Sequence, residues 1–253
     1  QGLVENVQIL SSNLVSNGSF SQEGAEQVTN GDFVTDTGWL NTGGTWVVNN
    51  GALTLNSSDN GKYFYRTDVL YNSTLNYKVV VVVDSITTGN ISLLVGNIPT
   101  SNITTPNTYT YYITGTSNSN INIKNVLSDA VVSNISVKEV GQNWTQTSNN
   151  WSFGNNKAIA DGTSQGSLQQ SISTIAVGSK YKINYTISDY VAGNVRLYFG
   201  GVFTDFKSSN GSYSQVITST STDGSIATSI ATPFNGSITN ISVIEITDDT
   251  NLP

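Results

Sequence analysis

Alternating hydrophobic and polar positions are the strongest secondary-structure signal in this chain. Tyr181, Ile183, Tyr185 and Ile187 occupy every second position, and polar or charged residues stand between them. A period of two is typical of a β-strand with one buried face and one face toward solvent. Residues 77–83 have the same apolar positions but also valines between them, which predicts a central strand that is covered on both faces.

Tight-turn signals separate these apolar stretches. Asn or Asp directly precedes Gly at several positions, among them Asn30-Gly31, Asn50-Gly51, Asn60-Gly61, Asn210-Gly211, Asp223-Gly224 and Asn235-Gly236. Such dipeptides adopt the positive φ angles of two-residue hairpin turns. We see no convincing amphipathic helix. Short strands with turns at this spacing predict an all-β fold of antiparallel β-sandwiches, of the jelly-roll type.

The chain repeats one pattern after 104 residues. Tyr181 follows Tyr77 by this distance, and Gly193 follows Gly89 by the same distance. Further matches join residues 108–114 to 212–218, 133–140 to 239–246, and the pair Trp39 and Trp46 to the pair Trp144 and Trp151. Several matches in one order at nearly one offset indicate a duplicated module.

The repeat predicts two tandem β-sandwich modules, residues 28–140 and 141–247. Each holds enough chain for a core of its own. We expect the polar residues 248–253 to form a C-terminal linker.

The first 27 residues have no counterpart in the 104-residue repeat. Val15–Phe20 resembles Val28–Phe33, so a module-opening motif occurs twice in quick succession. We expect residues 1–27 to be a short N-terminal extension, with residues 3–10 as a strand or fibre segment that leads in from an upstream region.

The composition excludes several kinds of chemistry. The 253 residues include no Cys and no His, which removes Ser-His-Asp and Cys-His catalysis, the usual zinc sites and any disulfide. A formal net charge of −7 argues against nucleic acid and against anionic lipid. No apolar run approaches the roughly 20 residues that span a bilayer, so we expect no membrane insertion.

Carboxylates are the remaining candidates for catalysis, because glycosidases use a pair of them. Most acidic residues stand singly in turn-like stretches. Asp205 and Asp223 have no counterparts that we can align in the first module. No local acid pair suggests hydrolysis, and we predict that the chain is not an enzyme.

Two sets of motifs resemble known families. Asn30-Gly31-Asp32-Phe33, followed by Gly38-Trp39, resembles the start of carbohydrate-binding modules of the galactose-binding-like jelly-roll kind. The stretches Asn134–Trp144 and Ile246–Pro253 resemble module junctions in bacteriophage tail-fibre or head-fibre structural proteins. The resemblance covers nearly the whole chain from about Asn13.

The resemblance implies adhesion. Its expected partners are a cell-surface glycan and other virion proteins, and its expected location is the virion surface or the extracellular space. Fibre proteins of this kind also imply a homo-oligomer.

In such modules a structural calcium often lies between the opening segment and the closing strand. The resemblance implies Asp32 and Glu139 as its ligands here. The second module departs from the pattern, because Gly141-Gln142-Asn143 stands where Asn30-Gly31-Asp32 would be.

The four tryptophans allow two interpretations. They could stack on sugar rings, or they could lie in the core, because Trp is highly buried on average. Their repetition in both modules favours packing, above all for Trp46 and Trp151. Trp39 and Trp144 lie nearer the loops, and for them both interpretations stay open.

A tyrosine pair is the next candidate for a glycan platform. Tyr63 and Tyr65 alternate around Phe64, so both face outward beside Arg66 if Phe64 faces the core. Packing between modules or subunits is the alternative. In the second module, Arg196 and Tyr198 face outward if the residues between and after them are core.

Three functions therefore remain open. Host-surface glycan recognition by a fibre-like virion appendage is the favoured one. The alternatives are a purely architectural virion spacer or decoration protein, and a bacterial surface adhesin or filament subunit.

Overall fold

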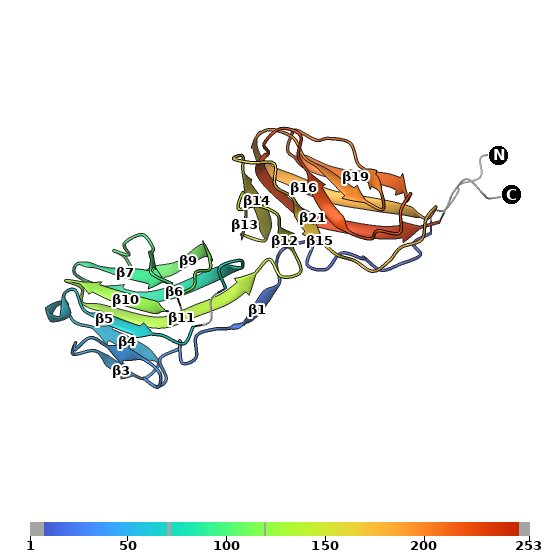
Figure 1. Ribbon diagram of the computed structural model, residues 1–253. Coiled ribbons are helices and arrows are strands. Elements are labelled where there is room, and N and C mark those ends of the chain that lie inside the picture. The colour runs from blue at the N-terminus through green and yellow to red at the C-terminus, as the bar shows by residue number, and fades with distance from the viewer. Residues whose placement is uncertain (1–7, 70–71, 119, 248–253) are drawn as a thin grey trace, which may run out of the picture. The chain divides into compact units, whose positions relative to one another are not determined.

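The computed structural model describes residues 8–69, 72–118 and 120–247, and β-strands dominate it (Figure 1). Within these residues the one helical element is a 3-10 turn, η1 (Ser57–Asp59). No helix in the described part of the chain could span a membrane. The predicted all-β class is confirmed. Residues 1–7 and the predicted linker 248–253 lie outside the described residues.

Module 1 consists of Glu23–Val140 and is a sandwich of two antiparallel sheets. In spatial order, one sheet contains β3 (Val47–Asn49), β4 (Ala52–Leu55), β11 (Ala130–Val140), β6 (Asn76–Ile86) and β9 (Asn107–Thr114), with β1 (Glu23–Glu26) also paired to β11. The other contains β2 (Leu40–Asn41), β5 (Tyr63–Arg66), β10 (Ile121–Val126), β7 (Asn90–Val95) and β8 (Ile98–Pro99).

Module 2 repeats this arrangement. One sheet contains β13 (Trp151–Gly154), β14 (Lys157–Asp161), β21 (Asn235–Ile246), β16 (Lys180–Ala192) and β19 (Gly211–Thr218). The other contains β12 (Thr145–Gln146), β15 (Leu168–Gln170), β20 (Ile226–Ser229), β17 (Arg196–Phe199) and β18 (Val202–Phe203).

The strand order identifies both modules as jelly rolls. In module 1 the order β4-β11-β6-β9 faces the order β5-β10-β7-β8, so most consecutive strands alternate between the two sheets. This is the order that two interleaved Greek keys produce. Module 2 has the same order, β14-β21-β16-β19 and β15-β20-β17-β18. The jelly-roll prediction is therefore confirmed in both copies.

The period-two pattern sets the two faces of the central strands. In β6, Val79, Val81 and Val83 are at most 2% exposed and point into the core, whereas Val80 and Val82 are half-buried on the other face. β6 lies between β11 and β9, so both of its edges are hydrogen-bonded. Its central position agrees with the sequence prediction, although its outer face is only partly covered.

Among the described residues, module 2 is made from two separate pieces of chain, residues 8–22 and 141–247. The structure thus differs from the expected extension, because residues 8–22 belong to module 2 and module 1 interrupts it in the sequence. The reason is backbone pairing with β21: the N–H of Leu14 donates to the carbonyl of Val243 at 2.9 Å, and the N–H of Ile241 donates to that of Gly18 at 3.0 Å. The N-terminal segment can be followed along module 2 in blue (Figure 1).

The opening motif serves both modules in the same way. Phe20 is 3% exposed, and its ring centroid lies 5.2 Å from Trp144 and 5.6 Å from Phe153. In module 1, Phe33 is fully buried and lies 5.3 Å from Trp39. The two opening motifs noted in the sequence are therefore one for each module.

A glycine in each motif permits close approach to the closing strand. A Cβ on Gly18 would lie 1.9 Å from the carbonyl oxygen of Ile241, and a Cβ on Gly31 would lie 2.0 Å from that of Ile135. Only glycine fits such contacts without a backbone shift. Asn17-Gly18-Ser19, and not residues 141–143, is hence the module 2 counterpart of Asn30-Gly31-Asp32.

Candidate functional site

The candidate tryptophans lie in the core. Trp39 is 7% exposed and Trp144 is 8% exposed. The indole N–H of Trp39 donates to the carbonyl of Asn30 at 2.9 Å, and that of Trp144 donates to the carbonyl of Asn17 at 3.1 Å. Each indole therefore anchors the opening motif of its module. Rings this deeply buried do not offer a face to a sugar.

Arg66 is also buried, at 3% exposure, although we expected it beside an exposed tyrosine pair. Its guanidinium forms an ion pair with Asp68 and donates to the carbonyls of Thr29 and Thr37 at 2.8 and 3.1 Å. The hydrogen bond from Arg66 holds the pKa of Asp68 below its ordinary value. Arg66 is on the same side of β5 as the core residue Phe64, so it closes the opening loop and is not a ligand residue.

In module 2 an uncharged side chain holds the opening loop in the same way. Gln170 occupies the position that matches Arg66, and it is 5% exposed. Its amide nitrogen donates to the carbonyl of Ser16 at 2.8 Å, and its amide oxygen accepts from the N–H of Ser16 at 2.8 Å. A buried polar side chain in both modules thus binds the backbone before the Asn-Gly pair, which is a structural role.

The structure separates the two expected calcium ligands. The N–H of Ile135 donates to the carbonyl of Gly31, next to Asp32, whereas Glu139 lies four residues farther along β11, about 13 Å away at the usual rise of a strand. Burial raises the pKa of Glu139, which disfavours the charged form that calcium needs. In the described residues, no group of three or more acidic side chains could hold a metal ion.

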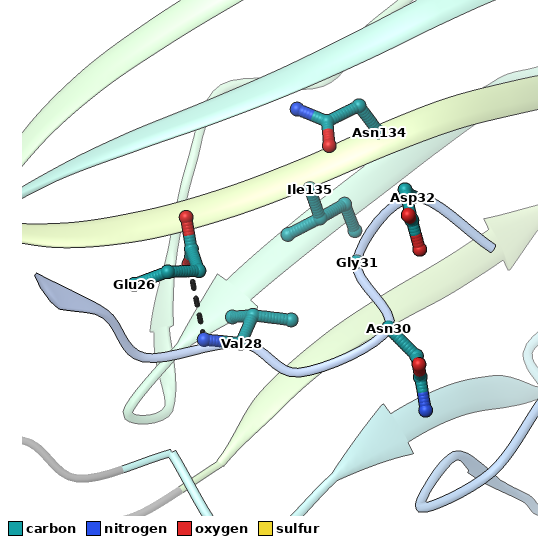
Figure 2. Close-up of a pocket in the computed structure, with 7 residues that line it drawn as sticks. All are labelled: Glu26, Val28, Asn30, Gly31, Asp32, Asn134 and Ile135. Atoms are coloured by element: carbon teal, nitrogen blue, oxygen red, sulfur yellow. Dashed lines mark hydrogen bonds between the residues drawn. The ribbon is translucent and has the colours of Figure 1, made fainter. Parts of the chain in front are cut away.

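A pocket of about 250 Å³ does lie at the opening motif of module 1. Figure 2 shows its lining residues: Glu26, Val28, Asn30, Gly31, Asp32, Asn134 and Ile135. Glu26 Oε1 accepts from the backbone N–H of Val137 at 2.7 Å. In module 2, Asn13 Oδ1 accepts from the N–H of Val243 at 3.0 Å. The neutral amide of Asn13 thus makes the same contact to the closing strand as the Glu26 carboxylate, which indicates that Glu26 serves mainly to bind the backbone.

Tyr63 and Tyr65 lie on the outer face of module 1, as predicted. Both are half-buried, and the residue between them points into the core at 4% exposure. Tyr63 pairs with Lys124 on β10, and the ammonium group lies 5.8 Å from the tyrosine ring centroid. Leu40, opposite Tyr65, is 48% exposed. We name Tyr63, Tyr65 and Lys124 the module 1 face.

An aromatic cluster on the outer face of module 2 contains both candidates from β17. The Cζ atom of Arg196 lies 3.9 Å from the ring centroid of Phe203 and 4.2 Å from that of Phe206. The ring of Tyr198 lies 5.1 Å from that of Phe203. Phe203 and Phe206 are 44% and 39% exposed. We name these four residues the module 2 platform.

A tight hairpin brings the module 2 platform together. Gly200 and Gly201 have φ angles of 58° and 84°, the positive pair that a two-residue hairpin turn requires. This turn places Tyr198 directly opposite Phe203 on β18. The aromatic residues after a Gly-Gly turn were the sequence signal for Phe203 and Phe206, which the sequence analysis missed.

Polar groups border the module 2 platform. The hydroxyl of Tyr198 donates to the carboxylate of Asp223 at 3.4 Å, and Nε of Arg196 donates to the hydroxyl of Ser229 at 3.4 Å. The backbone N–H of Ser225 donates to Asp223 at 2.9 Å and lowers the pKa of that carboxyl, so Asp223 is ionised at neutral pH. Aromatic rings, a cation and an anion therefore meet on one exposed surface.

The exposed clusters differ between the modules although the cores match. In module 1 the positions of Arg196, Tyr198 and Phe203 hold Ser92, Leu94 and Pro99, and in module 2 the positions of Tyr63 and Tyr65 hold Ser167 and Gln169. Packing explains residues that both copies share. It does not explain exposed aromatic groups that only one copy has, and these are candidates for binding.

No family model matches the sequence, and no curated protein matches it. Among solved structures, the CBM22-1-CBM22-2 tandem domain of Paenibacillus barcinonensis Xyn10C is 11% identical, covers 92% of this chain and 94% of its own, and has a TM-score of 0.32. Allantoicase from Saccharomyces cerevisiae is 9% identical, with coverages of 73% and 77% and a TM-score of 0.28. A chain of Sulfolobus Turreted Icosahedral Virus is 11% identical, with coverages of 78% and 54% and a TM-score of 0.24. Likenesses with TM-scores this low carry no information about function.

Proposed function

We propose that this chain binds carbohydrate without catalysis and that the module 2 platform is the binding surface. The observation that carries the proposal is the exposure of Phe203 and Phe206 beside Arg196 and Tyr198. Large aromatic groups at a surface suit a ligand that has both apolar and polar faces. The sequence has no His and no Cys, which supports binding without covalent chemistry.

Sugars have the matching chemistry. The C–H groups on one side of a pyranose ring form a flat apolar patch that stacks on an aromatic ring. The ionised carboxylate of Asp223 accepts hydrogen bonds from sugar hydroxyls, and such charge-assisted bonds are stronger than neutral ones. An open surface of this kind binds weakly, and we expect dissociation constants of roughly 10 μM to 1 mM, or about −4 to −7 kcal/mol.

The module 1 face supplies a second, chemically different surface. Tyr63 and Tyr65 offer two aromatic rings with hydroxyl groups, and Lys124 offers an ammonium group. Two weak sites in one chain raise the avidity for a polysaccharide that reaches both. We therefore expect stronger retention on polymers than on short oligosaccharides.

The biological setting that we propose is adhesion to host-surface glycans by a fibre-like virion appendage. The support for this setting is the resemblance of Asn134–Trp144 and Ile246–Pro253 to phage module junctions. The same resemblance supports a homo-oligomer at a virion surface or outside the cell. Sedimentation of the full chain tests this part, and a monomer at micromolar concentration contradicts it.

The experiment for the binding proposal is retention of the chain on immobilised polysaccharides, with substitutions in the module 2 platform. Phe203→Ala and Tyr198→Ala are expected to weaken retention at least about fivefold, because each removes a stacking surface. The matched control is Val191→Ala in module 2, which is 68% exposed and lies outside the platform. Equal retention of all variants, with unchanged thermal midpoints, contradicts the proposal and favours an architectural spacer.

A further inference from the structure

We infer that the module 2 platform is selective for acidic saccharides, with Arg196 as the residue that recognises a carboxylate or sulfate group on the sugar. This inference rests on the proposed function and names the class of ligand. Its starting point is the charge of Arg196, which the stacking of sugar rings alone does not need.

Arg196 is held without an ion-pair partner among the described residues. It contacts the rings of Phe203 and Phe206 and forms a long hydrogen bond to the hydroxyl of Ser229. Two lysines of module 2 are paired: Lys157 with Asp189 at 2.9 Å, and Lys207 with Asp205 at 3.7 Å. In a chain of net charge −7, a guanidinium that has found no carboxylate is a distinct feature.

The two rings orient this guanidinium. The Cζ atom lies over both rings, 3.9 and 4.2 Å from the centroids of Phe203 and Phe206, so the guanidinium packs against both rings. A guanidinium that uses its face for stacking keeps N–H groups on its edge for hydrogen bonds. These groups match the two oxygens of a carboxylate, or two oxygens of a sulfate ester, in a bidentate contact.

The anion at the other side of the module 2 platform gives the ligand a direction. Arg196 pairs with Ser229 on β20, and Tyr198 pairs with Ala227. The hydroxyl of Tyr198 donates to Asp223, which precedes β20, so the carboxylate of Asp223 lies at the Tyr198 end of the module 2 platform and Arg196 lies at the other end. An acidic sugar that stacks on Phe203 gains when its charged group lies at Arg196, and loses when that group lies at Asp223. Removing the charge of Asp223 should therefore increase the preference for acidic over neutral sugars.

The test uses pairs of ligands that differ only in charge. Oligogalacturonate is compared with its methyl ester, and glucuronan oligomers are compared with cello-oligosaccharides, by calorimetry on the full chain. Sulfated and unsulfated galactan oligomers form a third pair, which separates sulfate from carboxylate. We expect at least one acidic member to bind about tenfold more tightly than its neutral partner, with an affinity that falls as salt rises.

Variants of Arg196 assign that preference. Arg196→Gln should abolish the tenfold preference and its salt dependence, Arg196→Lys should retain part of both, and Asp223→Asn should increase the preference. Far-UV circular dichroism and thermal midpoints establish that the variants are folded. Equal binding of acidic and neutral partners, or a preference that survives in Arg196→Gln, overturns the inference and leaves carbohydrate binding intact. Absence of binding to every saccharide overturns the proposed function and this inference with it.

Discussion

Replacement of Phe20 by Ala should destabilise module 2, although all of module 1 lies between Phe20 and the strands of module 2 in the sequence. Phe20 is 3% exposed and packs between Trp144 and Phe153. Truncation of a buried phenylalanine costs about 3–5 kcal/mol, because the apolar surface is lost and a cavity stays behind. For a domain of this size that cost lowers the thermal midpoint by roughly 10–25 °C.

Hydrogen exchange measured by mass spectrometry separates the two modules, because peptides report on individual strands. In Phe20→Ala, exchange should accelerate in β16 and β21 of module 2 and stay unchanged in β6 and β11 of module 1. Phe33→Ala is the mirror experiment, since Phe33 is fully buried in module 1. Val34→Ala is the surface control, because Val34 is 67% exposed.

The reasoning would be refuted if Phe20→Ala left the protection of β16 and β21 at the wild-type level. The N-terminal segment would then be an extension, as the sequence analysis expected. Loss of protection in module 1 alone would equally contradict the assignment of residues 8–22 to module 2.

Three further predictions follow from contacts elsewhere in the structure. Gly18→Ala should destabilise module 2 by at least about 2 kcal/mol in denaturant unfolding, because its Cβ would overlap a carbonyl oxygen of β21; a wild-type midpoint would contradict the close approach. Asp68→Asn should cost module 1 about 1 kcal/mol at neutral pH, a small value because the carboxylate is 61% exposed and screened by solvent. The pKa of Asp68 is depressed in the folded state, so the stability from its pair with Arg66 is present above the ordinary pKa near 3.8 and is lost as the pH falls through the folded pKa. Asp68→Asn should therefore remove that part of the acid dependence of module 1 stability. An acid unfolding profile that does not change in Asp68→Asn would argue against the pair. Tyr63→Ala and Tyr65→Ala should each weaken polysaccharide retention about two- to fivefold if the module 1 face contributes avidity, and unchanged retention would limit binding to module 2.

Most of the fold could be predicted from the duplicated sequence pattern. Strands such as β6 and β16 were predictable because a period of two reflects a buried face, and two copies of one pattern confirmed each other. The repeated tryptophans followed the same logic: Trp39, Trp144 and Trp151 are buried in the core, and Trp46 is partly buried against it.

The chain order of module 2 was harder to predict. Gly18 pairs with Ile241 across more than 200 residues, and nothing local to either residue reveals a partner so distant. The second copy of the Asn-Gly-x-Phe motif near Phe20 was the available signal. From the sequence we expect an extension there, although the motif is the opening segment of module 2.

Arg66 shows why charge misled the side-chain prediction. Strict alternation from Phe64 places Arg66 on the core side, but a charged residue is rarely buried without partners. Here Asp68 and two carbonyl groups form hydrogen bonds with its guanidinium, and those partners come from loops whose paths the sequence does not show.

Only half of the module 2 platform could be predicted, for a similar reason. Alternation turned Arg196 and Tyr198 outward, whereas the positions of Phe203 and Phe206 depend on a hairpin and the loop after it.

The most direct test of carbohydrate binding by the module 2 platform is a nuclear magnetic resonance titration of the full chain with ¹³C-labelled phenylalanine. A saccharide that is retained in the polysaccharide screen is added until binding saturates. We predict that the ring signals of Phe203 and Phe206 shift or broaden with the ligand, while those of the core residues Phe33 and Phe64 stay in place. Binding that leaves the signals of Phe203 and Phe206 unchanged, or no saturable binding by any saccharide, would contradict the proposed function.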